Sequence, residues 1–347
     1  MNQKKLKVVQ IGVGRFGAKR RKLMRFTGLF DLIAAYDINP DALKQCREED
    51  GAEIVNSYEE LINYPEAEAV IISTGAKFHA AQIIAAARKG LHVFVEKPVC
   101  SNKEDLDEII RVQGETGTVI GVGHCDHSQD GATLKIKEMI ESGEMGRISA
   151  FEQTTCHAGG LQIKPGDWRG DHEQNPGGML FQCGCHAFHK LIYLFGPIKE
   201  IQSVMRYDVN NNTETADAAI CLITFENGII GSLNAYHVSP YRRTLNIYGT
   251  GKNVYYRNHS FSRGEEMFEQ TELLDNCEQP DVSLSYEEIE NGGASGGLVS
   301  FYNAIRNGGE LYPSLIDGAK AAAVVFAAEL SAKSGKPVNL EDVGLNY

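Results

Sequence analysis

The stretch that most constrains the fold is the run LKVVQI followed by GVGRFG at residues 6–17. The first run is apolar and rich in β-branched residues, which is typical of a buried parallel strand. Gly12, Gly14 and Gly17 follow in G-x-G-x-x-G spacing, and AKRRKLMRF continues as a helix. In such a unit the glycines permit a tight turn, backbone approach to a pyrophosphate, and close helix packing. The start of the chain therefore predicts a dinucleotide-binding unit.

A second apolar run, FDLIAAYD, strengthens this prediction because it ends in Asp37, 20 residues beyond Gly17. An acidic residue at this place accepts hydrogen bonds from the ribose hydroxyls of the adenosine and repels a 2′-phosphate. The sequence therefore favours NAD over NADP as the cofactor. The alternative interpretation is that Asp37 is an ordinary turn residue at the end of a strand.

Strand-like and helical segments then alternate up to Gly123, with further strands in AEAVIIST, HVFVEKP and TVIGVG. This alternation predicts an α/β domain with a doubly wound parallel sheet, the Rossmann arrangement. Ligands of such sheets bind at the carboxyl ends of the strands. Besides the glycine-rich turn, two segments follow strand ends, Ser73–His79 and Glu96–Pro98. A lysine in the second of these, Lys97, is either a solvated strand end or a catalytic group.

The pattern changes after Gly123, and we predict two domains, 1–123 and 124–347. AAICLITFENGIIGSLNAYH reads as two strands around an Asn-Gly turn, which is a strong hairpin signal. The second domain is therefore predicted to be α+β, with a large, mostly antiparallel sheet. Residues 258–294 are polar and poorly patterned, and we predict a long irregular excursion there.

Charge and composition limit the partners of the protein. The net charge of −12 and the pI near 5.4 argue against nucleic-acid binding. For the basic cluster at residues 19–25, KRRKLMR, a solvated helix face is favoured over phosphate binding. No apolar run is long enough for a membrane helix or a signal-peptide core, and the 8 cysteines lack a disulfide pattern. We expect a cytoplasmic protein with reduced thiols.

The segment GGMLFQCGCHAFHKLIYLF at 177–195 has helical periodicity, and its spacing places Gln182, His186 and His189 on one stripe. Cys183 falls off that stripe, and Cys185 is adjacent to it but turned away from His186. A zinc site would need ligands that converge, and a redox pair would favour C-x-x-C spacing. Buried structural thiols are therefore the favoured interpretation, and no metal is expected.

The glycine-rich turn, Asp37, STGAKFH and above all GLHVFVEKPVC resemble the Gfo/Idh/MocA family of sugar and cyclitol oxidoreductases, and the similarity runs along essentially the whole chain. The resemblance implies that Lys97 works beside the nicotinamide and contacts the hydroxyl being oxidised. It also implies a cis peptide bond between Lys97 and Pro98.

In the second domain the family carries Gly-Gly, an Asp, a His four residues later and often a further Asp. By this resemblance His186 accepts the substrate proton, while Gln182 and His189 stand at the two Asp positions. Gln182 hydrogen-bonds the substrate or the ring without adding charge, and His189 either replaces the missing group or packs in the core. The segment DWRGD resembles the Trp-Arg loop of the family, so Trp168 and Arg169 are expected near nicotinamide and substrate. Core packing is the alternative for Trp168.

These considerations yield a set of expected site residues. Catalysis is assigned to Lys97, His186 and Gln182. Cofactor contacts are assigned to Gly12, Gly14, Arg15, Phe16, Gly17, Asp37, Ser73, Thr74, His79, Glu96, Lys97, Trp168 and Arg169. Substrate contacts are assigned to Lys97, His124, His157, Arg169, Gln182, His186 and His189, with His127 as a further candidate.

The expected activity is that of an NAD-dependent dehydrogenase acting on a secondary alcohol of a sugar, cyclitol or derivative. One alternative is a glycosidase or lyase that oxidises its substrate transiently and retains the cofactor. Another is a non-catalytic sensor that binds a dinucleotide. The resemblance further implies a homodimer or homotetramer.

Overall fold

The computed structural model describes residues 4–124, 131–263, 266–275 and 286–347, with only the backbone described within 258–295. The chain forms two compact units, and each is described by itself. The first unit comprises Met1–Asp126 and Ala294–Ala319, and the second comprises His127–Gly293 and Lys320–Tyr347. The units therefore differ from the predicted single boundary at residue 123, because a segment from late in the chain returns to the first unit.

The first unit is built on a six-stranded sheet in the order β3-β2-β1-β4-β5-β6. Every strand pair in this sheet is parallel. The strands are β1 Leu6–Ile11, β2 Phe30–Tyr36, β3 Glu53–Ile54, β4 Ala69–Ile72, β5 His92–Val95 and β6 Ile120–Val122. The predicted doubly wound parallel sheet is confirmed. Its strand order reverses between β1 and β4, which is where ligands of such sheets bind.

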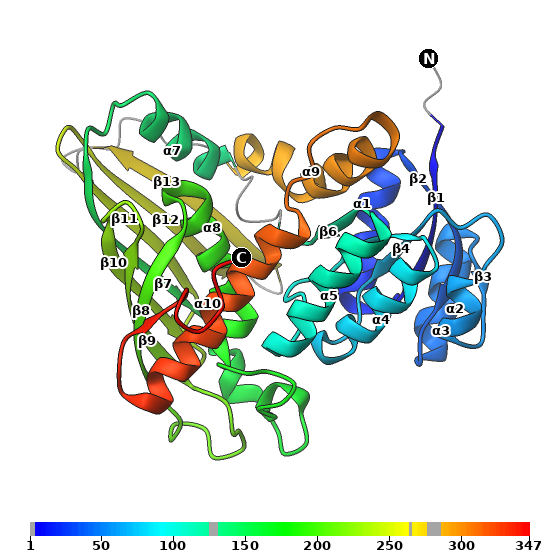
Figure 1. The fold of residues 1–347 in the computed structure, drawn as a ribbon, viewed down its shortest axis with the longest axis horizontal. Coiled ribbons are helices and arrows are strands. Elements are labelled where there is room, and N and C mark those ends of the chain that lie inside the picture. Colours follow the sequence, from blue (N-terminus) through cyan, green and yellow to red (C-terminus); the bar gives the residue numbers. More distant parts are fainter. Residues whose placement is uncertain (1–3, 125–130, 264–265, 276–285) are drawn as a thin grey trace. The chain divides into compact units, whose positions relative to one another are not determined.

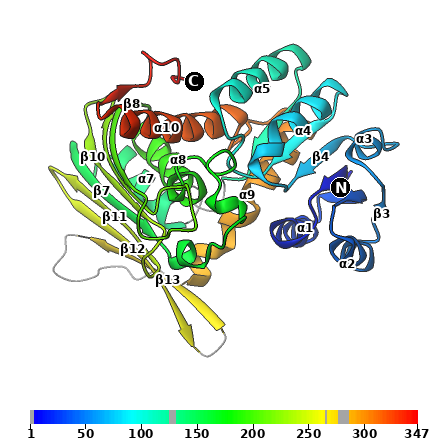
Figure 2. The same cartoon turned by 90° about the horizontal axis from the view of Figure 1, so that it is seen from below.

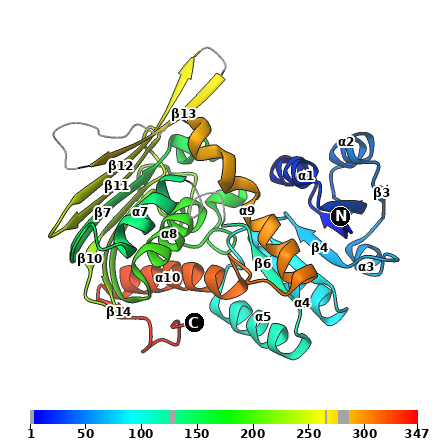
Figure 3. The same cartoon turned by 90° about the horizontal axis from the view of Figure 1, so that it is seen from above.

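Helices cover both faces of this sheet (Figures 1, 2 and 3). On one face α1 and the later part of α9 pack on the strands through Met24, Leu298, Phe301 and Tyr302. Helices α4 and α5 pack against each other on the other face. The helices are α1 Arg15–Thr27, α2 Pro40–Asp50, α3 Tyr58–Ile62, α4 Ala76–Arg88, α5 Lys103–Thr116 and α9 Tyr286–Asn307.

The second unit contains an eight-stranded sheet in the order β13-β12-β11-β7-β10-β9-β8-β14. Only the β7–β10 pair is parallel among these strands, so the prediction of a mostly antiparallel sheet is confirmed. The strands are β7 Ile148–Cys156, β8 Ile198–Arg206, β9 Ala218–Phe225, β10 Ile230–Tyr236, β11 Arg242–Gly249, β12 Asn253–Arg263, β13 Glu266–Asp275 and β14 Val338–Asn339.

Three helices lie on one face of this sheet, as Figures 2 and 3 show. They are α7 Gly131–Glu141, α8 Cys185–Phe195 and α10 Leu315–Ser334. The predicted hairpin around Asn227-Gly228 is present as β9–β10. The prediction of an irregular excursion over 258–294 is wrong where residues are described, because β12 pairs with β13 as a long antiparallel hairpin. No described helix is long and apolar enough to cross a bilayer.

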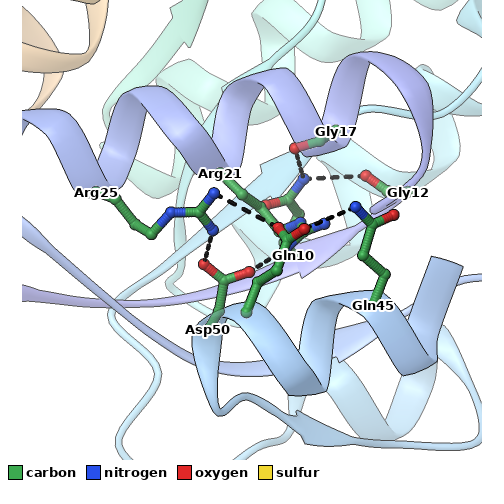
Figure 4. A network of polar contacts seen from close by, with 8 residues as sticks. Gln10, Gly12, Gly17, Arg21, Arg25, Gln45 and Asp50 are labelled. Carbon is green, nitrogen blue, oxygen red and sulfur yellow. Dashed lines mark hydrogen bonds and ion pairs between the residues drawn. The ribbon is translucent and has the colours of Figure 1, made fainter.

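Part of the basic cluster in α1 is buried, contrary to the predicted solvated face. The Arg20 and Arg21 side chains are 3% and 0% exposed, while Lys19, Lys22 and Arg25 are exposed. Arg21 and Arg25 both pair with Asp50 of α2, as Figure 4 shows. Carboxylates supplied by another helix make the burial of these cations tolerable. These arginines therefore tie α1 to its neighbours and do not face a phosphate backbone.

Candidate active site

The glycine-rich turn lies at the carboxyl end of β1, where backbone segments approach one another closely. Gly12 has φ +79°, and a Cβ there would lie 2.6 Å from the carbonyl oxygen of Ser73 after β4. A Cβ at Gly17 would lie 1.9 Å from the Gly12 carbonyl oxygen. Gln10 braces the same turn, because its Nε2 donates to the carbonyl oxygens of Gly12 (3.0 Å) and Gly17 (3.2 Å) (Figure 4). Two of the three glycines are thus required by the protein's own packing.

Gly14 differs, because a Cβ there would meet only ordinary contacts, with Ala42 at 3.6 Å and Asp37 at 4.0 Å. The fold alone therefore does not demand glycine at this position. The Asp37 Oδ2 accepts from the backbone N–H groups of Val13 (2.7 Å) and Gly14 (3.3 Å). The carboxylate thus lies beside the amino end of α1, where a dinucleotide's ribose and pyrophosphate would meet the chain.

Ser73 and Thr74, at the end of the neighbouring strand β4, form the next part of this edge. The Ser73 hydroxyl is buried and has no hydrogen-bond partner among the described residues. The Thr74 hydroxyl instead donates to Gln82 of α4 at 2.7 Å. Arg15 and Phe16 are exposed beside the glycine-rich turn. The open Gly14 position and the Ser73 hydroxyl are features that a bound dinucleotide would satisfy, so the residues present fit the cofactor.

The Glu96-Lys97-Pro98 turn follows β5, and its Lys97–Pro98 peptide bond is cis, as the resemblance implied. Lys97 is half-buried. Glu96 is 7% exposed and accepts from Arg20 of α1, whose Nε lies 2.8 Å and whose Nη2 lies 2.7 Å from Glu96 Oε1. The Arg20 guanidinium also lies 5.0 Å from the ring centroid of Phe94. Glu96, the residue before Lys97, is therefore held within the first unit by its ion pair with Arg20.

His79 of α4 holds the other side of the same turn. It is 1% exposed, with Nδ1 2.9 Å from the Pro98 carbonyl oxygen and Nε2 3.1 Å from the Thr74 carbonyl oxygen. Burial lowers its pKa to about 4, against the smaller opposing effect of these two carbonyls. A neutral ring has one N–H, so it donates to one carbonyl at a time. His79 thus connects the two loops that follow β4 and β5.

In the second unit, the helix predicted within 177–195 is present, but Gly177 and Gly178 form a turn and a π-helical turn at Leu180–Gly184 precedes α8. Gln182 lies within the π-helical turn, and His186 lies in the first turn of α8. The residues that share a cavity are Cys183, His186, Ala187 and Lys190. Gln182 is half-buried and His189 is 2% exposed, and neither lines that cavity.

This cavity, of about 20 Å³, lies between α8 and the sheet. Strands β7, β11 and β12 contribute the remaining lining residues, which are Gln153, Thr155, Arg243, Thr244 and Tyr256. His186 is half-buried in its wall. His186, the expected proton acceptor, thus lies among polar and basic side chains in this cavity. We call this cavity the α8 cavity.

A second group of candidates gathers where β7 and β10 end. Because these strands are parallel, His157 and His237 follow them at the same edge, with ring centroids 4.8 Å apart. His237 is 2% exposed, and burial lowers its pKa to about 4, with smaller lowering effects from the neighbouring His157 ring and from Arg169. Sequence reasoning missed His237, since only the parallel pairing of distant strands brings it to His157.

The predicted Trp-Arg loop lies near this pair of histidines. The guanidinium of Arg169 lies 4.5 Å from the ring centroid of Trp168, and its Nη1 is 3.3 Å from Asp167 Oδ1. Trp168 is 39% exposed, so it does not pack in the core. Backbone contacts fix the loop, because Asn175 and Thr215 both donate to the Arg169 carbonyl oxygen.

His124, at the end of β6, is 1% exposed, and His127 lies outside the described residues. The six described cysteines are free thiols. In the described part of the chain, no three His, Cys, Asp or Glu residues form a group suited to a metal ion.

Two family models match the chain. The model of the oxidoreductase family with NAD-binding Rossmann fold matches residues 6–124, and the GFO/IDH/MocA C-terminal domain matches residues 133–254. The chain belongs to the Gfo/Idh/MocA family. It is therefore an oxidoreductase with an NAD-binding Rossmann domain, as the sequence motifs predicted.

Relatives of known name place the chain among the dehydrogenases of this family. It is 24% identical to myo-inositol 2-dehydrogenase of Thermotoga maritima, over 97% of this chain and 99% of the relative. It is 32% identical to 1-carboxy-3-chloro-3,4-dihydroxycyclohexa-1,5-diene dehydrogenase of Comamonas testosteroni, over 65% of this chain and 57% of that protein. A solved structure of a candidate NADPH-dependent oxidoreductase from Desulfitobacterium hafniense superposes with a TM-score of 0.86 at 26% identity, covering 98% and 99% of the two chains.

Proposed function

We propose that this protein is a dehydrogenase that moves a hydride between NAD and a secondary alcohol of a sugar, cyclitol or related compound. The observation that supports it most is the arrangement at the carboxyl edge of the first sheet. There the glycine-rich turn, Asp37, Ser73 and the Lys97 turn follow the adjacent strands β1, β2, β4 and β5. The names of the cyclitol-oxidising relatives supply the substrate class.

A nicotinamide cofactor bound at this edge would supply the hydride acceptor for oxidation of the carbinol carbon of the substrate, or the hydride donor for the reverse reaction. The Lys97 ammonium stabilises the alkoxide that develops on the substrate oxygen, and its backbone is held by Glu96–Arg20 and by His79. His186 accepts the hydroxyl proton, since a neutral imidazole within reach of a hydroxyl suits general base catalysis. Gln182 contributes a hydrogen bond without charge, and Trp168 and Arg169 belong to the substrate and nicotinamide surroundings.

NAD is proposed over NADP because Asp37 stands where an adenosine ribose would bind, already hydrogen-bonded to the glycine-rich turn. A 2′-phosphate would bring negative charge against this carboxylate. The relative described as NADPH-dependent makes the cofactor choice worth direct measurement.

The test follows absorbance at the NADH band with NAD or NADP and a panel of cyclitols, sugars, sugar acids and glycosides. NADH formation by the wild type, reduced by at least about 100-fold in Lys97→Ala, supports the dehydrogenase. Unchanged turnover in Lys97→Ala contradicts the role of Lys97. Retained NAD with substrate conversion but no net NADH would favour the cofactor-retaining glycosidase or lyase, and ligand binding without conversion would favour a sensor.

We further propose a homodimer or homotetramer formed through the sheet of the second unit. Val204, Ile220, Leu222 and Ile230 are 71%, 48%, 57% and 55% exposed on strands β8, β9 and β10. Apolar side chains gathered on neighbouring strands favour a protein interface. Mass photometry is expected to show a multiple of the 38.1 kDa chain mass, and a single-chain species at micromolar concentration would contradict this. A cytoplasmic location stays a prediction from the sequence, which cell fractionation would check.

A further inference from the structure

The segment 171–178 joins the Trp-Arg loop to the π turn that precedes α8. Its own backbone hydrogen bonds close only short turns, such as the one from Asn175 N to the Asp171 carbonyl oxygen at 3.0 Å. Gly177 and Gly178 adopt φ values of +69° and +54°. A segment that belongs to neither a helix nor a sheet depends on contacts with other elements for its position.

One carboxylate from far along the chain reaches this segment. Glu329 of α10 is 8% exposed, and its Oε1 accepts from the backbone N–H of Gly177 at 2.6 Å and lies 2.9 Å from His172 Nε2. Because an ionised carboxylate only accepts hydrogen bonds, Nε2 is a nitrogen of His172 that carries a proton. The segment also packs on α10, since a Cβ at Gly177 would lie 3.1 Å from Val325 Cγ1. We call the two hydrogen bonds of Glu329 Oε1 the Glu329 anchor.

The part of α10 that carries Glu329 is itself fixed to the sheet of the second unit. Ser203 of β8 donates its N–H to Ser331 Oγ at 3.0 Å and its hydroxyl to the Ala328 carbonyl oxygen. The two serines are 4% and 0% exposed. Their bonds lie on either side of Glu329 along the helix, so the carboxylate is presented by a well-held element.

The segment connects two groups of proposed site residues. At one end, Asn175 Nδ2 donates to the Arg169 carbonyl oxygen in the Trp-Arg loop at 2.7 Å. At the other end, Leu180 N donates to the Gly177 carbonyl oxygen at 3.0 Å, where the π turn before His186 begins. The anchor therefore holds both groups through one short stretch of chain.

We propose that Glu329 is a positioning residue for the proposed reaction. Its Oε1 fixes the 171–178 segment and, through it, Trp168 and His186. This inference rests on the proposed dehydrogenase function. A general base works only within hydrogen-bond reach of the hydroxyl that it deprotonates, and a displacement of about 1 Å can lower a rate by about 100-fold. Since Glu329 is not among the described residues that line the α8 cavity, it provides a well-placed acceptor for the segment, and glutamine should replace it.

The chain contains its own reporter of this region, because Trp168 is its only tryptophan. The ring is 39% exposed and lies 4.5 Å from the Arg169 guanidinium. Glu329→Ala removes the acceptor, and we expect the Trp168 emission to shift to the red and its quenching by acrylamide to increase. Glu329→Gln keeps an acceptor oxygen and should leave both close to wild type. This measurement needs neither cofactor nor substrate, so it tests the anchor separately from the proposed function.

Turnover is measured with NAD and whichever of myo-inositol, scyllo-inositol, glucose and galactose the wild type oxidises fastest. Glu329→Ala should lower kcat/KM by about 10- to 100-fold, with kcat falling and KM rising together. Glu329→Gln should stay within about fivefold of wild type, because a neutral acceptor bonds more weakly but keeps the geometry. His172→Ala removes one of the two donors and should give a smaller loss. Because His172 is half-buried, this variant decides the test if Glu329→Ala does not fold.

Asp317→Ala is the matched control. Asp317 lies on the same helix, and its Oδ2 likewise accepts from one backbone N–H and one side chain, both of Ser314, at 2.8 and 2.7 Å. The variant should lower the melting temperature and leave the Trp168 emission, kcat and KM unchanged.

The outcomes separate the two proposals. An emission change in Glu329→Ala that Glu329→Gln does not show, without turnover of any probe by the wild type, would uphold the anchor and contradict the dehydrogenase function. Turnover by the wild type with unchanged emission or unchanged kcat/KM in Glu329→Ala would overturn the positioning role and leave the dehydrogenase intact. A Glu329→Gln variant as impaired as Glu329→Ala, or an equal emission change in Asp317→Ala, would also overturn it.

Discussion

The buried ion pair between Arg20 and Glu96 supports a quantitative prediction about what holds the lysine turn in place. Both side chains are nearly inaccessible, at 3% and 9% side-chain exposure. Removing one member leaves the other charged and buried without its partner, which costs roughly 3–5 kcal/mol in other proteins. Arg20→Met and Glu96→Gln are therefore each expected to lower the free energy of unfolding of the first unit by about that amount.

The double variant Arg20→Met, Glu96→Gln should recover most of this loss, because no uncompensated charge then stays inside. Crowding limits the choice of replacements, since a Cβ added at Gly123 would lie 2.9 Å from Glu96 Oε2 and 3.1 Å from Arg20 Nη2. Methionine and glutamine approximate the volumes they replace and avoid an additional clash.

The assay is guanidinium unfolding followed by far-UV circular dichroism, with hydrogen exchange of peptides from α1 and β5 to assign the effect to the first unit. Arg111→Met on α5 is the control, because Arg111 is 51% exposed in its pairs with Glu108 and Glu115. An exposed pair of this kind contributes about 0–1 kcal/mol. The reasoning is refuted if Arg20→Met costs no more than Arg111→Met, or if the double variant is as unstable as the single ones.

Three further predictions concern the cofactor edge. Gly17→Ala should destabilise the first unit and abolish NADH binding, because its Cβ would lie 1.9 Å from the Gly12 carbonyl oxygen. Gly14→Ala should weaken NADH binding with a nearly unchanged melting temperature. Fluorescence titration measures NADH binding and scanning fluorimetry measures the melting temperature, so the two assays separate these outcomes. Asp37→Ser should shift the ratio of kcat/KM toward NADP, since a repulsive carboxylate is removed, and an unchanged ratio would count against its place at the ribose. Because burial holds the pKa of His79 at about 4, the unfolded chain takes up a proton between pH 6.5 and 4 that the folded chain does not. Stability should therefore fall by up to about 3 kcal/mol as pH drops through that window and level off below it; His79→Gln should remove this component in urea unfolding at pH 4.5 and 7.

The first sheet and its cofactor edge could be predicted because their signals are local. Gly12 directly follows β1, Gly17 lies in the first turn of α1, and Asp37 directly follows β2, so spacing alone places them. The cis peptide bond between Lys97 and Pro98 was predicted only from the resemblance to a family motif. The β9–β10 hairpin was predictable because Asn227-Gly228 defines its turn.

The features that sequence reasoning missed depend on contacts between distant segments. Arg20 reads as a solvated cation until Glu96 is found beside it, 76 residues along the chain. His237 meets His157 only through the parallel pairing of β7 with β10. The π turn at Leu180–Gly184 before α8 leaves no clear mark in a helical pattern. The β12–β13 hairpin escaped prediction because its polar sequence lacks the alternation that marks a half-buried strand.

The return of Ala294–Ala319 to the first unit has a consequence for how the protein is made. Leu298, Phe301 and Tyr302 complete the core beneath β1, β4 and β5, and Pro313 accepts a hydrogen bond from Val122. A ribosome adds about 5–20 residues per second, so the nascent Rossmann sheet waits on the order of ten seconds or longer for this covering. During that time the part of the apolar sheet face that α9 later covers is exposed to chaperones and to other nascent chains. Expression of residues 1–126 alone would make that transient exposure permanent.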